Sequence, residues 1–433
     1  MSLKQKRSTL GGVGLLVGLC LASAVNAEVP VVQYSHGTLD FGGMIQLLGF
    51  GQRVDDPYKN NERVYLFLKE ARLRASGNYD DFRFHLEIAL GGEDTVAAPN
   101  PGVTLGLLDF SADIPLHALG KTYLKVGQFK VPYGRERLAY SGYSQFVDRS
   151  VQDLGFKVGR DVGVTLNLCP GPFTVVAGIF TGGGRDIPPE HYLPQNLGVP
   201  LLVARAGIGS VDDDPYELHQ NELDARKVKS AFFVNGLYTK DSAVGHSTAL
   251  NVKLADKSVL LDSTWNPYIG KAPLQQGTWW QYGGDAAVRV PLGAFIFSGE
   301  AELNYGGYSN DKGSLHMFGG RAQGGVLLNR LELALRYSFL LPTGNYSNSG
   351  TAIMGDRPIH EVTPAVTYYF HGHNLKLVAD LPLLFNAPLF NEKGVGSYVG
   401  TELPAEAALL AKAGNSVTHS TVIEGRLMFQ ALF

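Results

Sequence analysis

The last twelve residues, Val422 to Phe433, read VIEGRLMFQALF and decide the fold of the chain. Side chains alternate between the two faces of a β-strand. On this pattern Leu427, Phe429 and Phe433 share an apolar face, whereas Glu424 lies on a polar one. One face suits lipid or a core, and the other suits water. A soluble sandwich could use one such strand, so the fold depends on whether the rest of the chain repeats the pattern.

The first 27 residues have the order of a secretory signal peptide. Basic residues at positions 4, 6 and 7 precede the apolar run Leu10 to Ala22, and cleavage is predicted after Ala27. The run is shorter than the roughly 20 apolar residues that a membrane-spanning helix needs. The alternative of a lipoprotein signal is disfavoured because Leu19 precedes Cys20, where a small residue is needed. We therefore expect a leader at 1–27 and an exported domain at 28–433.

The composition favours a chain with many strands. The sequence contains 53 glycines, 20 tyrosines and 22 phenylalanines, and its mature part has no apolar run long enough for a spanning helix. Removal of the leader changes the net charge from −3 to −6, which gives no reason to expect nucleic acid as a partner. Only Cys169 remains, so we expect no disulfide, no cysteine-based metal site and no haem motif, and no cofactor is predicted.

The alternation of the last twelve residues recurs along the chain. In one example Phe84, Leu86 and Ile88 alternate with His85 and Glu87. Such segments are about 9–11 residues long, the length that crosses a bilayer at a tilt. We predict sixteen strands, at 41–51, 64–77, 80–90, 106–114, 121–130, 159–168, 172–181, 229–240, 247–255, 278–290, 295–305, 316–328, 331–341, 359–370, 374–383 and 418–433.

Short connections alternate with long ones between these segments. Short periplasmic turns, long outer loops and an even number of strands are typical of an outer-membrane barrel, because only a closed sheet leaves no backbone edge unpaired in lipid. We therefore predict an all-β fold, a transmembrane antiparallel β-barrel of about 16 strands in the bacterial outer membrane. The ending at Phe433 resembles the signature that the barrel assembly machinery recognises. The predicted short turns are 78–79, 115–120, 169–171, 241–246, 291–294, 329–330 and 371–373.

The third long loop, Val131 to Val158, is the best candidate for a channel constriction. Sixteen strands enclose a lumen wide enough for water, and the loop is rich in aromatic residues that would be buried if it folded inward. Residues 121–160 contain eight basic and three acidic residues. Rings of Arg and Lys select anions, and guanidinium groups bind oxyanions with paired hydrogen bonds. The candidates for lining the pore and binding anions are Arg72, Arg74, Lys125, Lys130, Arg135, Arg137, Arg149 and Arg160.

The same charges have a structural alternative. They could pair with carboxylates such as Glu70, Glu136 and Asp148 and brace the loop against the wall. The sequence leaves these two roles open.

Four segments carry a family resemblance. LKVGQFKVPYGRER at 124–137, FVDRS at 146–150, GRDVGVTL at 159–166 and FLKEARLRASGNYDDFRFHLEIAL at 67–90 are similar to the phosphate-selective porin O and P family. The clear resemblance covers 64–181. It implies a trimeric, sixteen-stranded porin with an arginine ladder and a central anion site that contains a lysine. By motif position it implies constriction roles for Lys130, Arg135, Arg137 and Arg160, with Arg72 and Arg74 as ladder residues.

Other motifs carry weaker signals. The acidic stretch 212–224 lies in the predicted fourth loop, 182–228, and could bind Ca²⁺, but it lacks regular calcium-loop spacing. The pair His371 and His373 flanks a predicted turn, and TGGGRD at 181–186 lacks the Lys-Ser/Thr of a phosphate loop. No nucleophile motif accompanies the histidines, so we do not expect an enzyme.

The sequence therefore predicts a porin for passive diffusion of small hydrophilic solutes, in particular oxyanions such as phosphate. A different class is a barrel that forms the sheath of an outer-membrane complex and encloses a partner such as a multihaem cytochrome. A surface adhesin that acts through the loop 182–228 is a third. An infolded third loop would leave too little room for a cytochrome.

Overall fold

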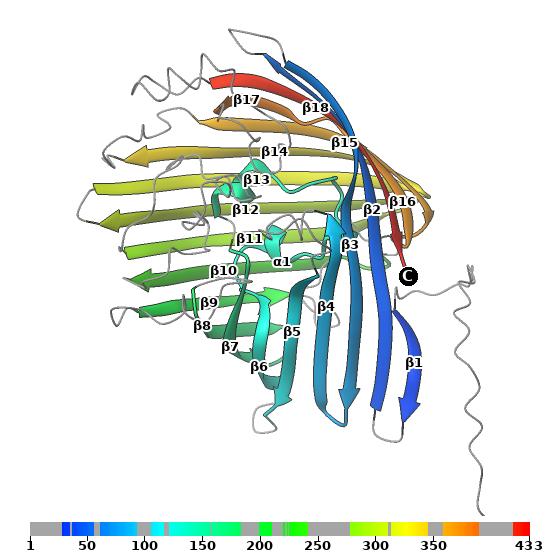
Figure 1. Cartoon of the computed structure of the whole chain (residues 1–433), viewed down its shortest axis with the longest axis vertical. Helices are drawn as coiled ribbons and strands as arrows, with labels where there is room; N and C mark the ends of the chain where they lie inside the picture. Colours follow the sequence, from blue (N-terminus) through cyan, green and yellow to red (C-terminus); the bar gives the residue numbers. More distant parts are fainter. Residues whose placement is uncertain are drawn as a thin grey trace, which may run out of the picture.

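A computed structural model describes residues 28–34, 37–55, 61–92, 105–116, 121–156, 158–182, 199–209, 220, 223, 225–240, 278–310, 313–344, 358–388 and 419–433. The leader predicted at 1–27 lies outside these residues. The described part is almost entirely β-strand and forms a closed antiparallel barrel (Figure 1). It contains no helix that is both long and apolar enough to cross a membrane.

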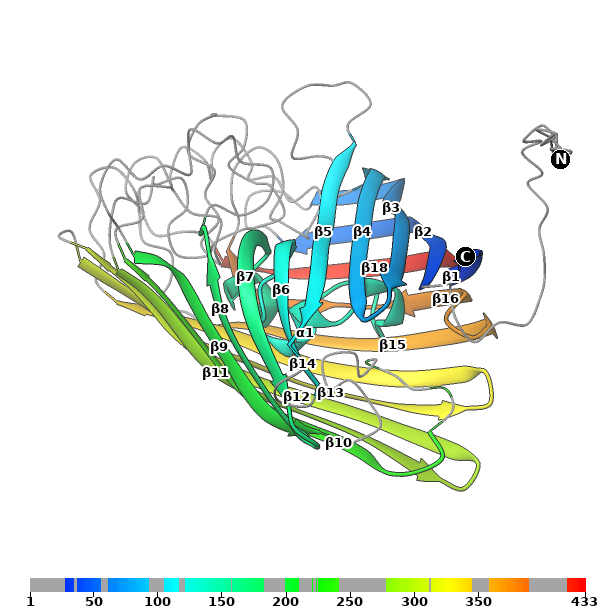
Figure 2. The same cartoon turned by 90° about the horizontal axis from the view of Figure 1, so that it is seen from below.

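Each strand of the ring pairs with the next one in the chain, and β18 closes the ring on β2 (Figure 2). β16 and β17 together occupy one position between β15 and β18, which gives sixteen positions. The strands are β2 (Gly37–Asp55), β3 (Asn61–Tyr79), β4 (Phe82–Gly92), β5 (Gly106–Pro115), β6 (Lys121–Lys130), β7 (Arg160–Cys169), β8 (Phe173–Phe180), β9 (Val199–Gly209), β10 (Lys229–Lys240), β11 (Thr278–Leu292), β12 (Phe295–Asn310), β13 (Gly313–Leu328), β14 (Leu331–Gly344), β15 (Ile359–His371), β16 (Leu375–Asp380), β17 (Leu383–Pro388) and β18 (His419–Leu432).

The two faces of the wall have opposite character. On β14, Leu333 and Leu335 are exposed on the outer face, whereas Glu332 and Arg336 are buried on the inner face. A soluble barrel would show the reverse, because its interior is the hydrophobic core. Apolar residues outside and polar residues inside are the arrangement of a barrel in lipid.

The final strand confirms the alternation from which the fold was predicted. Leu427 and Phe429 are exposed on the outer face, and Gln430 is fully buried on the inner face. The main chain of Phe433 exchanges two hydrogen bonds with Gly43 on β2, of 2.7 and 3.1 Å. Beyond that point an extra strand, β1 (Glu28–Tyr34), pairs with residues 37–42 of β2.

The predicted and observed strands differ in two parts of the ring. A strand, β9, lies within the predicted fourth loop and pairs with both β8 and β10. The segment predicted as a strand at 247–255 lies outside the described residues. The short turn predicted at 241–246 lies outside them too. β10 pairs directly with β11, so no strand separates them in the sheet. The single strand predicted at 374–383 is broken at Leu381 and Pro382 into β16 and β17.

The presence of β9 also changes the end of the barrel at which the next connection joins two strands. The connection between Gly209 and Lys229 joins strand ends at the same end of the barrel as the turn at Gly293. This turn end is the periplasmic end in barrels of this type. The acidic residues of the stretch 212–224, which was predicted to lie in an outer loop, are outside the described residues.

Candidate functional site

The segment between β6 and β7, residues 131–159, crosses the lumen, and we call it the constriction loop. It contains α1 (Arg135–Leu138), the 3-10 helix η1 (Ser141–Tyr143) and α2 (Val151–Phe156). Its Tyr133 hydroxyl donates to Asn304 on β12 at 2.9 Å, and its Val147 N–H donates to Asp380 on β16 at 2.9 Å. Four strands separate β7 from β12 and five separate β6 from β16. The predicted infolding is confirmed.

Burial of apolar side chains holds this loop inside the barrel. Phe146 is fully buried, and the Arg336 guanidinium lies over its ring at 4.5 Å from the centroid. Val147 packs in a small apolar cluster with residues of β2, β16 and β18, namely Leu48, Phe50, Val378 and Met428. The loop is therefore packed against one side of the wall, the side formed by β11 to β18, β2 and β3.

Polar side chains of the wall bind the backbone of the loop. Three cations on β3, β14 and β16 donate to its carbonyl oxygens, and three carboxylates accept from its N–H groups. Because a buried backbone group without a partner is costly, these bonds fix where the loop lies. The donors are Lys69 to Val147 at 2.6 Å, Lys376 to Ser144 at 2.8 Å and Arg336 to Asp148 at 2.8 Å, and the acceptors are Glu302 for Glu136 at 3.1 Å, Asp380 for Val147 at 2.9 Å and Glu361 for Val151 at 2.6 Å.

Two of the predicted anion-binding residues are buried in ion pairs. Arg135 is 2% exposed and its Nε lies 3.0 Å from Glu300 Oε1 on β12. Arg72 is 6% exposed and lies 3.1 Å from Glu70 and 3.6 Å from Glu87. Both guanidinium groups lie inside the barrel, as expected, but they bridge parts of the protein rather than face open lumen.

Six other predicted residues keep partial exposure. Arg160 on β7 donates to both Asp109 and Glu87 at 2.9 Å, and Arg137 pairs with Asp153 of the constriction loop. Lys125 lies 3.8 Å from Asp113. Partial exposure is shared by Arg74, Lys125, Lys130, Arg137, Arg149 and Arg160.

Lys130 and Arg149 differ from Lys125, Arg137 and Arg160 in having no carboxylate within 4.0 Å among the described residues. Lys130 Nζ instead donates to the carbonyl oxygens of Leu138 and Ala139, at 3.1 and 3.0 Å. Arg149 makes one long bond through Nε to the carbonyl of Glu136, at 3.4 Å. Asp109 and Glu87 act on Lys130 only at longer range, and Asp148 acts on the Arg149 guanidinium in the same way.

Arg137 lies close to this charge. Burial lowers the pKa of the Arg137 guanidinium to about 10, with Asp153 raising the pKa and the nearby Arg149 and Arg160 lowering it. The group remains cationic at neutral pH. Lys130 belongs with these three arginines because its strand pairs with that of Arg160, residue opposite residue. We call Lys130, Arg137, Arg149 and Arg160 the cationic cluster.

The wall carries five further buried arginines that were not among the predicted site residues. Each pairs with a carboxylate, for example Arg205 with Asp285 at 2.6 Å and Arg426 with Asp380 at 2.7 Å. Strand alternation could have placed Arg336 and Arg426 inside, but Arg205 lies on β9, which was predicted to be loop. The five are Arg205, Arg289, Arg321, Arg336 and Arg426.

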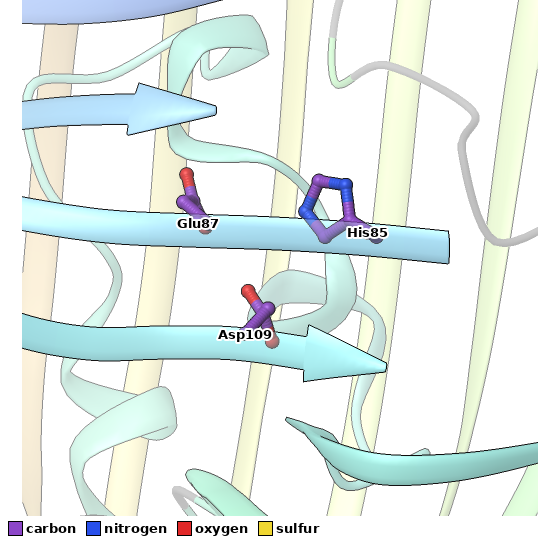
Figure 3. A group of neighbouring side chains, drawn as sticks. All are labelled: His85, Glu87 and Asp109. Carbon is purple, nitrogen blue, oxygen red and sulfur yellow. The ribbon is translucent and has the colours of Figure 1, made fainter. Parts of the chain in front are cut away.

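Three lumen side chains near the cluster have ligand atoms close enough together to hold a metal ion. Figure 3 shows His85 and Glu87 on β4 and Asp109 on the adjacent β5, with candidate ligand atoms within 4.8 Å of one another. Arg160 already donates to both carboxylates. A divalent cation would have to displace this guanidinium, so we assign the two carboxylates to holding Arg160.

The histidine pair singled out in the sequence, His371 and His373, lies at the turn between β15 and β16. The His373 ring contacts Tyr143 of the constriction loop and Tyr369 of β15, with centroids 4.9 and 5.6 Å apart. The backbone carbonyl of His373 accepts from Gln430 at 2.8 Å. Packing against these two tyrosine rings thus accounts for the position of the His373 side chain.

The β-barrel and the constriction loop folded into it are together typical of an outer-membrane porin. The model of the family described as phosphate-selective porin O and P matches residues 46–193, which confirms the family resemblance of the sequence. That region contains the constriction loop and all eight predicted site residues. Comparison with curated protein sequences finds no match.

Solved structures with the same fold come from outer membranes. OmpT of Vibrio cholerae is 12% identical, with a TM-score of 0.53, and the alignment covers 93% of this chain and 99% of that one. The outer membrane channel DcaP of Acinetobacter baumannii is 12% identical, with a TM-score of 0.52 and the same coverage. A trimer form of OmpT is also similar, at 12% identity, a TM-score of 0.51 and coverage of 92% and 100%. These likenesses show the fold, and the family match together with the barrel indicates the bacterial outer membrane.

Proposed function

We propose that the protein is a passive, anion-preferring channel whose constriction is lined by the cationic cluster. The observation that carries this proposal is the pair Lys130 and Arg149, two partly exposed lumen cations with no described carboxylate within 4.0 Å. A fixed positive charge in a narrow lumen attracts small anions and repels cations. Arg149 supplies a guanidinium fork that matches an oxyanion such as phosphate.

The eight predicted residues divide into two groups under this proposal. Arg72 and Arg135 act as braces, because burial and carboxylate partners remove them from the solute path. Lys130, Arg137, Arg149 and Arg160 form the constriction, and Arg74 and Lys125 are partly exposed lumen residues outside it. A passing anion exchanges part of its hydration shell for these donors, with no chemical turnover and no energy input.

The infolded loop favours a channel over a sheath. Hydrogen bonds tie the constriction loop to strands that are separated from β7 and β6 by four and five other strands, so the loop spans the space that an enclosed cytochrome would need. A sheath would need those bonds to break. An adhesin that acts through outer segments would bind without conducting ions, which the same bilayer experiment tests.

We further propose that the protein assembles as a homotrimer and inserts through the barrel assembly machinery by its last strand. The trimer form of the structurally similar OmpT supports the first part. The outward apolar face of β18, with Leu427 and Phe429 exposed, supports the second. Chemical cross-linking in isolated outer membranes, resolved by electrophoresis without heating, would show a trimer band; a monomer band alone would contradict trimerisation.

The channel itself is tested in planar bilayers with the purified protein. Under a KCl gradient the reversal potential should favour chloride, and added phosphate should reduce the chloride current. Channels without anion preference would leave a general porin. A folded barrel that forms no channels would contradict the proposal and favour the sheath or the adhesin.

A further inference from the structure

The centre of the constriction loop is bound by a residue from the turn end of the barrel. Gln145 is fully buried, and its backbone N–H donates to Gln220 Oε1 at 3.0 Å. Gln220 is 3% exposed and lies in the connection between β9 and β10. A buried N–H needs an acceptor, and here the acceptor is a side chain from outside both the loop and the wall strands.

Strands of the wall supply the other bonds described for this part of the loop. The Gln145 side chain donates to Glu332 on β14 at 2.7 Å and accepts from Gln323 on β13 at 2.9 Å. Lys376 binds the carbonyl of Ser144, and Asp380 binds the N–H of Val147. The wall therefore holds one side of the Ser144–Val147 segment, while Gln220 holds the main chain at its centre.

Leu223 lies across the mouth of the barrel from β10. Leu223 Cδ1 lies 3.7 Å from the position that a Cβ on Gly372 would take, and Gly372 belongs to the turn between β15 and β16. Four strands lie between β10 and β15, which is about 24 Å of wall at the usual strand spacing. Ala225, just before β10, is also buried. Contacts at this distance from β10 are made across the lumen rather than along the wall.

We propose that Gln220, with Leu223 and Ala225, forms an inner buttress that positions the constriction loop from the periplasmic end. Gln220 fixes the backbone of Gln145, and Leu223 packs against the β15–β16 turn. The buttress keeps the loop in one position, so that the channel has one open conductance. The inference rests on the proposed channel function and adds to it a positioning residue outside the region with the family motifs, 64–181.

The test is single-channel recording of the variant Gln220→Ala beside the unchanged protein. Loss of the acceptor leaves the Gln145 N–H unpaired, so the loop should visit displaced positions and the fraction of time in subconductance levels should rise roughly tenfold. Gln220→Glu keeps the acceptor oxygen and should restore the single level. Val228→Ala, in the same connection at an exposed position, should behave like the unchanged protein.

A second measurement keeps the proposal falsifiable if the variants insert poorly. Cysteines at positions 145 and 220, with Cys169→Ser to remove the cysteine of the barrel, should be joined by a short bifunctional thiol reagent in intact outer membranes. Absence of cross-linking, or a steady single level in Gln220→Ala, would overturn the buttress. In either case the unchanged protein would still conduct, whereas a protein that forms no channels would overturn the proposed function instead.

Discussion

Arg135 of the constriction loop and Glu300 of β12 form a buried ion pair, with 3.0 Å between Nε and Oε1. Glu300 also binds Arg289 at 2.9 Å and Arg321 at 3.0 Å, so one carboxylate holds three guanidinium groups. This shared pairing ties α1 of the loop to the far wall. Lumen cations that pair in this way brace the loop, whereas those of the cationic cluster face the solute.

Removal of a brace should change stability rather than selectivity. Arg135→Ala should lower the free energy of unfolding by about 1–3 kcal/mol, because Glu300 keeps two of its three partners. The measurement is the temperature at which the folded barrel loses its anomalous mobility in unheated electrophoresis. A clear fall in anion preference without a fall in that temperature would show that Arg135 lines the path.

Removal of a cluster cation should change selectivity rather than stability. Arg149→Gln should reduce the chloride-to-potassium permeability ratio by about 5-fold, because its side chain makes only one long bond and has no carboxylate partner among the described residues. The matched control is Arg53→Gln, which removes the same charge from an exposed position in the outer half of β2. Equal effects of the two substitutions would mean that total charge, and not the cluster, sets selectivity.

The stability of the loop should depend on pH through Asp148. Burial raises the pKa of this carboxyl, but Lys69, Arg426 and the N–H of Arg149 outweigh burial, so the pKa is lowered. The unfolded chain therefore takes up the proton first as pH falls. The stabilisation from Asp148 is complete above about pH 5, declines from about pH 4 and is lost below the lowered pKa.

The variant Asp148→Asn tests this pH dependence. Between about pH 5 and pH 2, the unfolding temperature of the unchanged protein should fall further than that of the variant. Lys69→Met should weaken the same dependence, because Lys69 is the largest of the charges that lower the pKa. Parallel curves for the unchanged protein and Asp148→Asn would assign the acid sensitivity to other carboxylates.

A backbone position next to the constriction should tolerate no side chain. Gly127 on β6 has φ of +126°, and a Cβ there would lie 2.1 Å from the carbonyl oxygen of Phe110 on β5. Gly127→Ala should reduce the yield of folded barrel in the outer membrane, because the paired strands must separate to admit the methyl group. Gly171→Ala, at a position that also has a positive φ, of +64°, but open space around it, is the control for a left-handed backbone without a clash. Equal yields for the two would contradict a steric role.

Most strands of the barrel could be predicted from the sequence, because a strand with lipid outside and water inside alternates apolar and polar side chains. Strands such as β10 and β12 to β14 show one apolar and one polar face, and these were predicted. β9 was missed because both of its faces are apolar: Leu201 and Val203 are buried on the inner face and Leu202 is exposed outside. Without alternation, and with proline and glycine nearby, this segment was assigned to a loop.

The roles of the charged residues could not be read from sequence to the same degree. Alternation places Arg72 in the lumen but does not show that Glu70 and Glu87 bind it there. The same holds for Arg135, whose partner is 165 positions away in the chain. Which cations remain without carboxylate partners depends on how the constriction loop packs, and that is a property of the tertiary structure.

The most direct test of the account is the reversal potential of the double variant Lys130→Met with Arg149→Gln, measured in a planar bilayer under a KCl gradient together with phosphate block. The account predicts that the unchanged protein favours chloride and is blocked by phosphate, and that the folded double variant conducts with both properties lost or strongly reduced. Unchanged selectivity and unchanged block in the double variant would contradict the assignment of the constriction to the cationic cluster.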